Sequence, residues 1–103
     1  MNRRVVFLKE ANADISEALS WYRNIGLEIE ENFKADLLDL FPILQENPYI
    51  FREVIPGIRM GLTRRFKYRV VYKVDEKEIL IVAILHSKRH ERKWRQRIRH
   101  KKD

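Results

Sequence analysis

The chain has 103 residues, of which 45% are hydrophobic, and it carries a formal net charge of +7. This length supports one folded domain, residues 1–103, with a single modest core. The absence of cysteine excludes a disulfide scaffold, and the longest apolar run, Ile79 to Leu85, is too short to span a membrane. We therefore expect a soluble cytoplasmic protein that uses neither a cofactor nor a bound metal.

The charges are divided unevenly along the sequence. Residues 9–54 contain ten acidic and four basic side chains, whereas residues 88–103 contain nine basic and two acidic ones. The preceding residues sum to zero, so the last segment supplies the whole net charge. Such asymmetry indicates a polyanionic partner, either a nucleic acid or a disordered acidic protein segment, although a solvated tail has the same pattern.

The first half of the chain predicts a strand and two helices. A short strand is expected over Arg3–Leu8. From Ala11 to Tyr22 the apolar residues recur at the spacing of an amphipathic helix, and Gly26 is well placed to end it. A second helix with the same spacing is expected from Leu27 to about Leu40. The short connection between the two predicts an antiparallel helical hairpin.

Prolines mark the end of this helical region. Pro42 lies within the helical periodicity and removes one backbone donor, so we expect a kink or a helix end near Leu38 to Phe41. Asn47-Pro48 predicts a turn. We expect an irregular loop over Tyr49–Ile55, closed by Pro56-Gly57.

The second half predicts three strands, over Ile58–Arg64, Tyr68–Val74 and Ile79–Leu85, with a hairpin turn at Asp75–Lys77. The last strand is apolar on both faces, which is typical of an interior strand. Ser87 can cap a final helix among the basic residues. The predicted fold is α+β: an N-terminal strand, an antiparallel helical hairpin packed on an antiparallel β-sheet meander, and a basic C-terminal helix or tail.

A series of elements extends along nearly the whole chain. It consists of Ala-x-x-Asp-Ile-x-Glu-Ala-x-x-Trp-Tyr at residues 11–22, a helix with Phe33 and Leu37, Asn47-Pro48, Gly57-Ile58-Arg59, the segment Phe66 to Tyr72, the apolar strand into His86, Arg89, and Trp94 with Arg97. In this order and spacing, the sequence resembles the RelE/ParE toxins of type II toxin–antitoxin systems. The resemblance implies a growth-inhibiting toxin of the plasmid-stabilisation type, with a helical hairpin packed on an antiparallel sheet.

The resemblance also implies partners. One branch of the family consists of ribosome-dependent mRNA endonucleases, or mRNA interferases, and another poisons DNA gyrase. The long hairpin and the Trp21-Tyr22 pair are more similar to the gyrase-directed ParE branch. In either branch the toxin forms a hetero-oligomer with a cognate antitoxin, ParD-like or other, which is acidic and folds on binding. A non-toxic remnant that only binds antitoxin is a further alternative.

The sequence departs from common family patterns at three places. Lys67 stands where proline is frequent between Phe66 and Tyr68. His90-Glu91 replaces an aspartate or asparagine followed by proline, and Pro42 interrupts the second helix. The first two departures lie in the basic half and bear on the geometry of target contacts.

His86 is the candidate catalytic residue for the nuclease alternative. A histidine pKa near 6.5 suits proton transfer to or from a ribose hydroxyl, and Arg65, or Arg64, with Arg89 could stabilise the charge on a pentacoordinate phosphate without a metal. The structural alternative is that His86 merely ends a buried strand and hydrogen-bonds its neighbour.

The candidate residues for binding the target or the antitoxin are basic or aromatic. Trp94 could anchor the last helix on the sheet or stack on a nucleobase, whereas Trp21, Tyr22 and Phe33 are expected to pack in the core. Alternation along the strands means that only about half of the cations between Arg59 and Lys73 can share one sheet face. The candidate binding residues are Arg59, Arg64, Arg65, Arg69, Lys73, Arg89, Lys93, Trp94 and Arg97.

Overall fold

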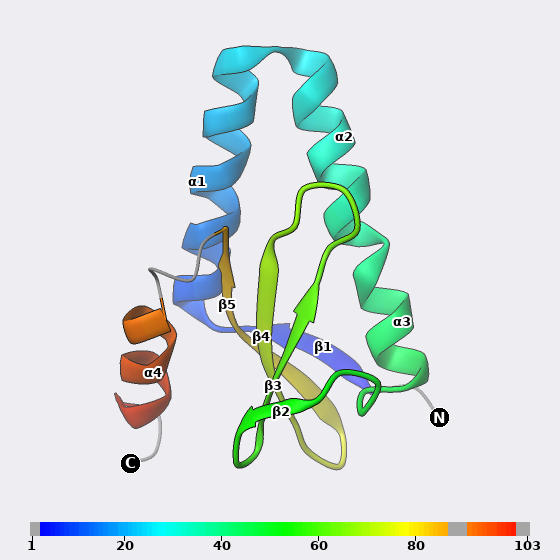
Figure 1. Ribbon diagram of the computed structural model, residues 1–103, viewed down its shortest axis with the longest axis vertical. Helices are drawn as coiled ribbons and strands as arrows, with labels where there is room; N and C mark the ends of the chain where they lie inside the picture. Colours follow the sequence, from blue (N-terminus) through cyan, green and yellow to red (C-terminus); the bar gives the residue numbers. More distant parts are fainter. Residues whose placement is uncertain (1–2, 87–90, 101–103) are drawn as a thin grey trace.

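The computed structural model of the protein describes residues 3–86 and 91–100 (Figure 1). The predicted α+β organisation is confirmed. In chain order the elements are β1 (Arg4–Phe7), α1 (Lys9–Ile25), α2 (Leu27–Leu38), α3 (Leu40–Glu46), β2 (Glu53–Ile55), β3 (Ile58–Leu62), β4 (Arg69–Val74), β5 (Glu78–Leu85) and α4 (Glu91–His100).

The helical hairpin forms as predicted. Gly26 separates α1 from α2, and its N–H donates to the Tyr22 carbonyl oxygen at 3.0 Å. Across the hairpin, the Arg23 guanidinium binds the Glu30 carboxylate at 2.7 Å. This bond raises the pKa of Arg23 and lowers the pKa of Glu30, because it favours the charged form of each group. The pair therefore ties the two helices together close to their connection.

The expected interruption of the second helix is also confirmed. The helix ends at Leu38 and a new one begins at Leu40, with Asp39 between them as a turn residue. Pro42 falls in the first turn of α3, where backbone N–H groups have no partner within the helix. The missing proline donor therefore costs α3 nothing, and a continuous helix through Pro42 would have lost a hydrogen bond.

The sheet has five strands in the order β1-β5-β4-β3-β2. Strands β3 to β5 form the predicted antiparallel meander, and β2 extends it in the antiparallel direction. The strand β1 instead adds in parallel to β5, with Val5 opposite Ile79. Strand β5 is therefore interior, as its apolar composition predicts. The expectation of a loop throughout Tyr49–Ile55 is wrong at its end, because Glu53–Ile55 forms β2. This strand is short and pairs irregularly with β3, so it has no readable alternation.

An extra residue in β5 reverses the side-chain alternation along that strand. Val71 lies opposite Ala83, but the next residue, Tyr72, lies opposite Ile81, so Val82 has no partner of its own. As a result Ile81 and Ile84 both belong to the core under α1–α3, whereas Val82 and Ala83 lie on the opposite sheet face.

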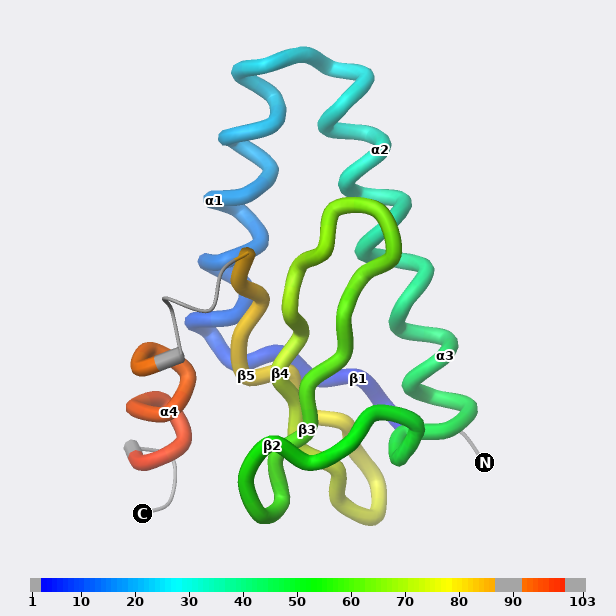
Figure 2. The backbone as a smooth tube through the Cα atoms, in the orientation of Figure 1, coloured from blue at the N-terminus to red at the C-terminus, as the bar shows by residue number. Residues whose placement is uncertain are grey.

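The two sheet faces carry two separate cores. The larger core packs β-strand residues such as Val70 and Tyr72 against α1, α2 and α3. The smaller core, on the opposite face, holds Val71, Val82 and Trp94 of α4. Figure 2 shows α4 beside β5 and away from α2 and α3. Within the described residues, no helix is long and apolar enough to cross a membrane.

Candidate functional site

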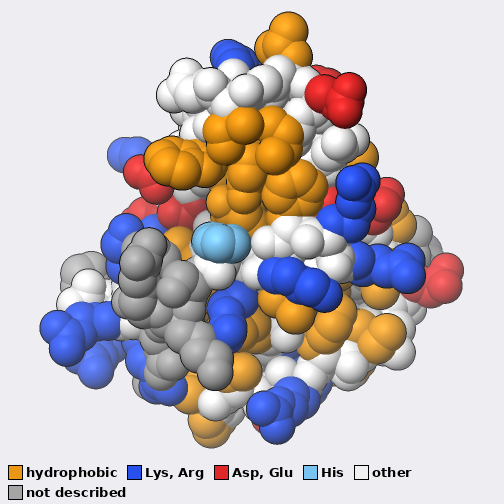
Figure 3. Space-filling model, turned by 45° about the horizontal axis from the view of Figure 1, so that its top comes forward, with side chains coloured by type: hydrophobic (Ala, Val, Ile, Leu, Met, Phe, Trp, Pro, Cys, Tyr) orange, Lys and Arg blue, Asp and Glu red, His pale blue; other side chains and the backbone are white. Residues whose placement is uncertain are grey.

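An open groove of about 510 Å³ lies between α1, the ends of β4 and β5, and α4. We call it the hairpin groove. Figure 3 shows hydrophobic side chains running down the middle of this side of the molecule to a histidine, with Lys and Arg side chains around the lower part. The residues that line the hairpin groove are Asp14, Glu17, Ala18, Trp21, Tyr22, Tyr68, Ile84, Leu85, His86 and Lys93.

An aromatic cluster lies at the hairpin groove, and Tyr22 and Tyr68 are its members that line the groove floor. The Tyr22 ring stacks on Phe33 with the centroids 4.9 Å apart, and Phe66 meets both rings edge-on. His86 follows the last residue of β5 and is exposed, with its ring 4.9 Å from that of Tyr68. The ring contacts among four of these residues stabilise the hairpin against the sheet, beyond the area that they bury; the four are Tyr22, Phe33, Phe66 and Tyr68.

Tyr68 of the groove stays protonated at neutral pH. Burial raises the pKa of the Tyr68 hydroxyl, and its hydrogen bond with Tyr22 acts in the same direction. Tyr68 can therefore donate a hydrogen bond but does not act as a base near neutral pH. Within β4, burial also raises the pKa of Tyr72, to about 12, and its hydroxyl donates to the Pro48 carbonyl oxygen at 2.7 Å.

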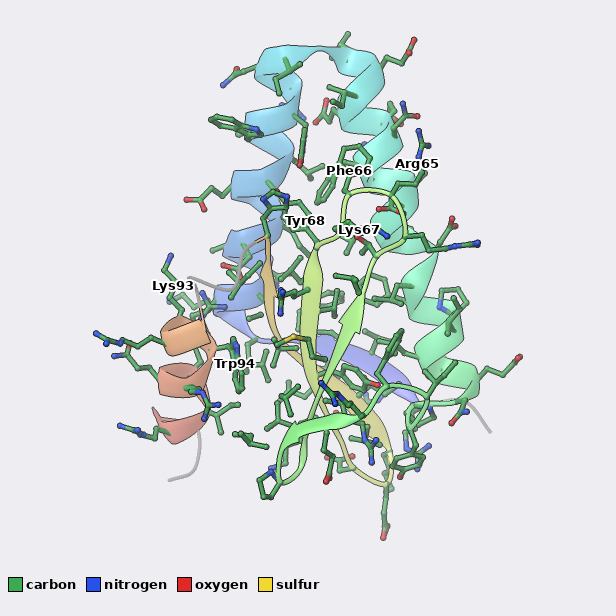
Figure 4. The ribbon with its side chains drawn as sticks, viewed as in Figure 1. Arg65, Phe66, Lys67, Tyr68, Lys93 and Trp94 are labelled. Atoms are coloured by element: carbon green, nitrogen blue, oxygen red, sulfur yellow. The ribbon has the colours of Figure 1, made fainter. Side chains whose placement is uncertain are left out.

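The β3–β4 loop, residues 63–68, is held against α2 by one carboxylate. Asp36 of α2 accepts hydrogen bonds from the backbone N–H groups of Arg65, at 3.1 Å, and Phe66, at 2.8 Å. Figure 4 shows this loop beside α2, with Arg65, Phe66 and Lys67 labelled on it. Lys67 has a φ of 60°, which no proline can adopt. The position at which this sequence lacks the proline that is frequent in the family therefore has a left-handed backbone conformation.

The predicted basic residues do not form one surface. Arg59 lies opposite Tyr72, on the helix side of the sheet, and its guanidinium donates to the Phe51 carbonyl oxygen at 2.7 Å. Its Cζ atom also lies 5.0 Å from the Tyr49 ring centroid. Arg59 therefore holds the chain that leads into β2. Arg64 and Arg65 are exposed on the β3–β4 loop.

Arg69 and Lys73 project to the other sheet face. Arg69 contacts the Met60 sulfur at 3.6 Å, and Lys73 lines an apolar hollow of about 390 Å³ together with residues such as Ile58 and Val82. The cations between Arg59 and Lys73 are therefore divided between two sheet faces and a loop, as strand alternation requires.

The three C-terminal candidates have different environments. Trp94 is only 2% exposed and anchors α4 on the sheet, as one of the two alternatives predicts. The Arg97 guanidinium binds the Asp14 carboxylate at 2.7 and 3.1 Å and the Val82 carbonyl oxygen at 3.1 Å. Lys93 lines the hairpin groove. Arg89 lies outside the described residues, as does Ser87, the expected cap of this helix.

The structure corrects the expectation that Trp21 packs in the core. Tyr22 and Phe33 are buried, but Trp21 is 65% exposed on the rim of the hairpin groove. Ile25 and Leu27, at the tip of the hairpin, are exposed as well. Helical periodicity gave Tyr22 the inward position, and consecutive helical residues point about 100° apart, so Trp21 could not share it. Its exposure leaves a large apolar ring on the surface, a feature that the sequence pattern did not reveal.

The nuclease cluster suggested by the sequence is not assembled among the described residues. Neither Arg64 nor Arg65 lines the groove that contains His86, because Asp36 holds their loop against α2. The described lining residues include one cation, Lys93, and two carboxylates.

The sequence over residues 5–91 matches the family described as the ParE toxin of the type II toxin–antitoxin system parDE. The chain therefore belongs to this family, and it is a toxin of the type II toxin–antitoxin class. No curated protein matches the sequence.

Solved structures show the same fold. One is a chain of the chromosomal ParDE system from P. aeruginosa, with 24% identity, a TM-score of 0.72, and coverage of 84% of this chain and 97% of that one. Another is a mutant of the E. coli toxin RelE in the free state, with 23% identity, a TM-score of 0.51, and coverage of 88% and 90%.

Proposed function

We propose that this toxin inhibits DNA gyrase and that a cognate antitoxin neutralises it. The observation that carries the proposal is the chemistry around His86. A phosphoryl-transfer transition state gathers negative charge and needs cations placed around it. In the described part of the hairpin groove, Glu17 instead places an exposed carboxylate on the rim, the Asp14 carboxylate is bound by Arg97, and Tyr68 remains protonated. This setting favours a protein-binding toxin over an mRNA endonuclease.

The gyrase proposal is tested with purified full-length toxin and its His86→Ala variant. We expect both proteins to inhibit supercoiling and to trap gyrase on cleaved DNA, and neither to cleave mRNA in a translating extract. Cleavage of mRNA by the wild type that is lost in the variant would establish the RelE-like alternative. Absence of growth arrest on induction would instead support a remnant that only binds antitoxin.

The hairpin groove is the proposed seat of the antitoxin. Trp21 exposes a large ring at its rim, and Arg64, Arg65 and Lys67 are exposed on the nearby β3–β4 loop. A segment that folds on binding could place apolar side chains against the aromatic floor and acidic ones against the loop. We expect Trp21→Ala to weaken antitoxin binding, measured by calorimetry, while Ile43→Ala, on the outer side of α3, leaves it unchanged. Equal affinities in the two variants would contradict this placement.

A further inference from the structure

The outward side of α4 concentrates positive charge and exposes no aromatic ring among its described residues. Trp94 lies between α4 and the sheet in Figure 4, and Ile98 is half-buried. The opposite side of the helix bears residues spaced three and four apart, which places them on one stripe. These residues, Arg92, Arg95, Gln96 and Arg99, line an open hollow of about 520 Å³.

The scaffold holds this basic stripe in a fixed position. Trp94 is buried in the smaller core, and the bidentate bond from Arg97 to Asp14 fastens α4 to α1. The Arg97 guanidinium also reaches the Val82 carbonyl oxygen in β5. Because α4 is fastened through its inner side, the helix backbone needs no ordering on binding, and only the outer side chains lose freedom. Among these, the Arg95 guanidinium already lies 5.0 Å from the Trp94 ring centroid.

The length of the stripe suits a nucleic-acid backbone. Arg92 and Arg99 are seven residues apart, about 10 Å along the helix axis. A DNA duplex carries one charge per about 1.7 Å of its axis, so the stripe spans several phosphates. Arginine binds phosphate oxygens in a bidentate manner, and the Gln96 amide adds a neutral donor between the charges.

We propose that the outward side of α4 binds the phosphodiester backbone of a nucleic-acid duplex without reading its sequence. Single-strand binding relies on exposed aromatic rings, and Trp94 is too deeply buried to stack on a base, which rules out that earlier alternative. A protein partner needs an apolar centre, which the residues of this stripe do not offer. The proposal goes beyond gyrase inhibition, because duplex binding requires no protein partner.

The test uses the full chain and labelled duplexes of about two helical turns, one of DNA and one of RNA. Binding is followed by fluorescence anisotropy at several salt concentrations. The logarithm of the binding constant is plotted against the logarithm of the salt concentration. The double variant Arg92→Gln with Arg99→Gln should reduce the magnitude of the slope by about 2, because each lost phosphate contact removes about 0.9. The control Lys9→Gln with Lys77→Gln removes the same charge from exposed positions outside α4 and should keep the wild-type slope. Circular dichroism verifies that both variants are folded.

Each remaining outcome bears on the proposal. Binding to either duplex supports the proposal and identifies the nucleic acid that α4 binds. Binding to neither duplex overturns the proposal. Equal effects of the two double variants would mean that net charge alone drives binding. Tighter binding to a single strand of equal length, or equal competition by polyglutamate of the same charge, would also overturn it. Since gyrase is absent from the assay, failure here leaves the proposed function standing, and failure of gyrase inhibition leaves duplex binding standing.

Discussion

Replacing Asp36 by alanine should destabilise the protein by about 3 kcal/mol. The residue is only 5% exposed, and its carboxylate accepts the N–H groups of Arg65 and Phe66. Hydrogen bonds to a charged group contribute roughly 1.5–3 kcal/mol each, and the lower value is appropriate because the two bonds share one carboxylate. For a domain of this size, such a loss lowers the melting temperature by about 12–24 °C.

The loss should depend on pH in a defined direction. Burial opposes ionisation of Asp36, but the hydrogen bonds from Phe66 and Arg65 more than offset it and hold the pKa of the carboxyl below its ordinary value. A lowered pKa gives stability that is fully present above the unfolded-state pKa, near 3.9, and is lost as the pH falls through the folded-state pKa. The difference between wild type and variant should be constant above about pH 5 and shrink in acid.

Urea unfolding followed by circular dichroism between pH 7 and pH 3 measures both effects. Asp39→Ala is the matched control, because Asp39 is exposed and its side chain makes no helix-capping hydrogen bond. It should change stability by less than about 0.5 kcal/mol. Equal losses in the two variants, or a difference that ignores pH, would refute the conclusion that the charged carboxylate anchors the loop.

Three further substitutions test the backbone and the smaller core by thermal or urea unfolding. Lys67→Pro, which restores the common family residue, should cost at least about 3 kcal/mol because φ at this position is 60°, and a wild-type midpoint would contradict that backbone. Trp94→Ala should lower the free energy of unfolding by about 3–5 kcal/mol, whereas Trp21→Ala, at an exposed position, should lower it by less than about 1 kcal/mol. Similar losses in the two variants would contradict the anchoring of α4 by Trp94. Gly57→Ala should cost about 1–2 kcal/mol because φ is 82°, while Gly26→Ala, in extended backbone with open space around it, should be tolerated.

Long periodic segments made the hairpin and the interior strand predictable. The apolar spacing in residues 11–22 fixes one inward helix side, and the run from Ile79 to Leu85 requires burial on both faces. The structure adds the reason for that run: Ile81 and Ile84 serve the larger core, and Val82 and Ala83 serve the smaller one. The parallel pairing of β1 and the short β2 had no such signal, because both depend on contacts between distant parts of the chain.

The candidate site was less predictable, since residue type does not reveal what a side chain contacts. Arg59 has the same charge as Arg64, yet its guanidinium is bound to the Phe51 carbonyl oxygen. Trp21 is exposed and Trp94 is buried, although both belong to amphipathic helices. The packing of α1 and α4 on the sheet determines which arginines face solvent and which tryptophan ring is buried. This packing cannot be predicted from a single sequence.

Three carboxylates of the acidic first half are used within the fold instead of facing a partner. Asp14 and Asp36 are largely withdrawn from solvent, the first on Arg97 and the second on backbone N–H groups, and Glu30 is buried against Arg23. These carboxylates are used within the fold, whereas the outward side of α4 and the β3–β4 loop keep exposed cations. Long-range attraction of an anionic partner should therefore come from those two places, and salt screens such attraction over about 10 Å at 0.1 M.

We expect added salt to slow association with the antitoxin more than it speeds dissociation, measured by stopped flow, because the aromatic contacts of the hairpin groove hold the formed complex. A salt effect confined to dissociation would place the charged contacts inside the complex instead.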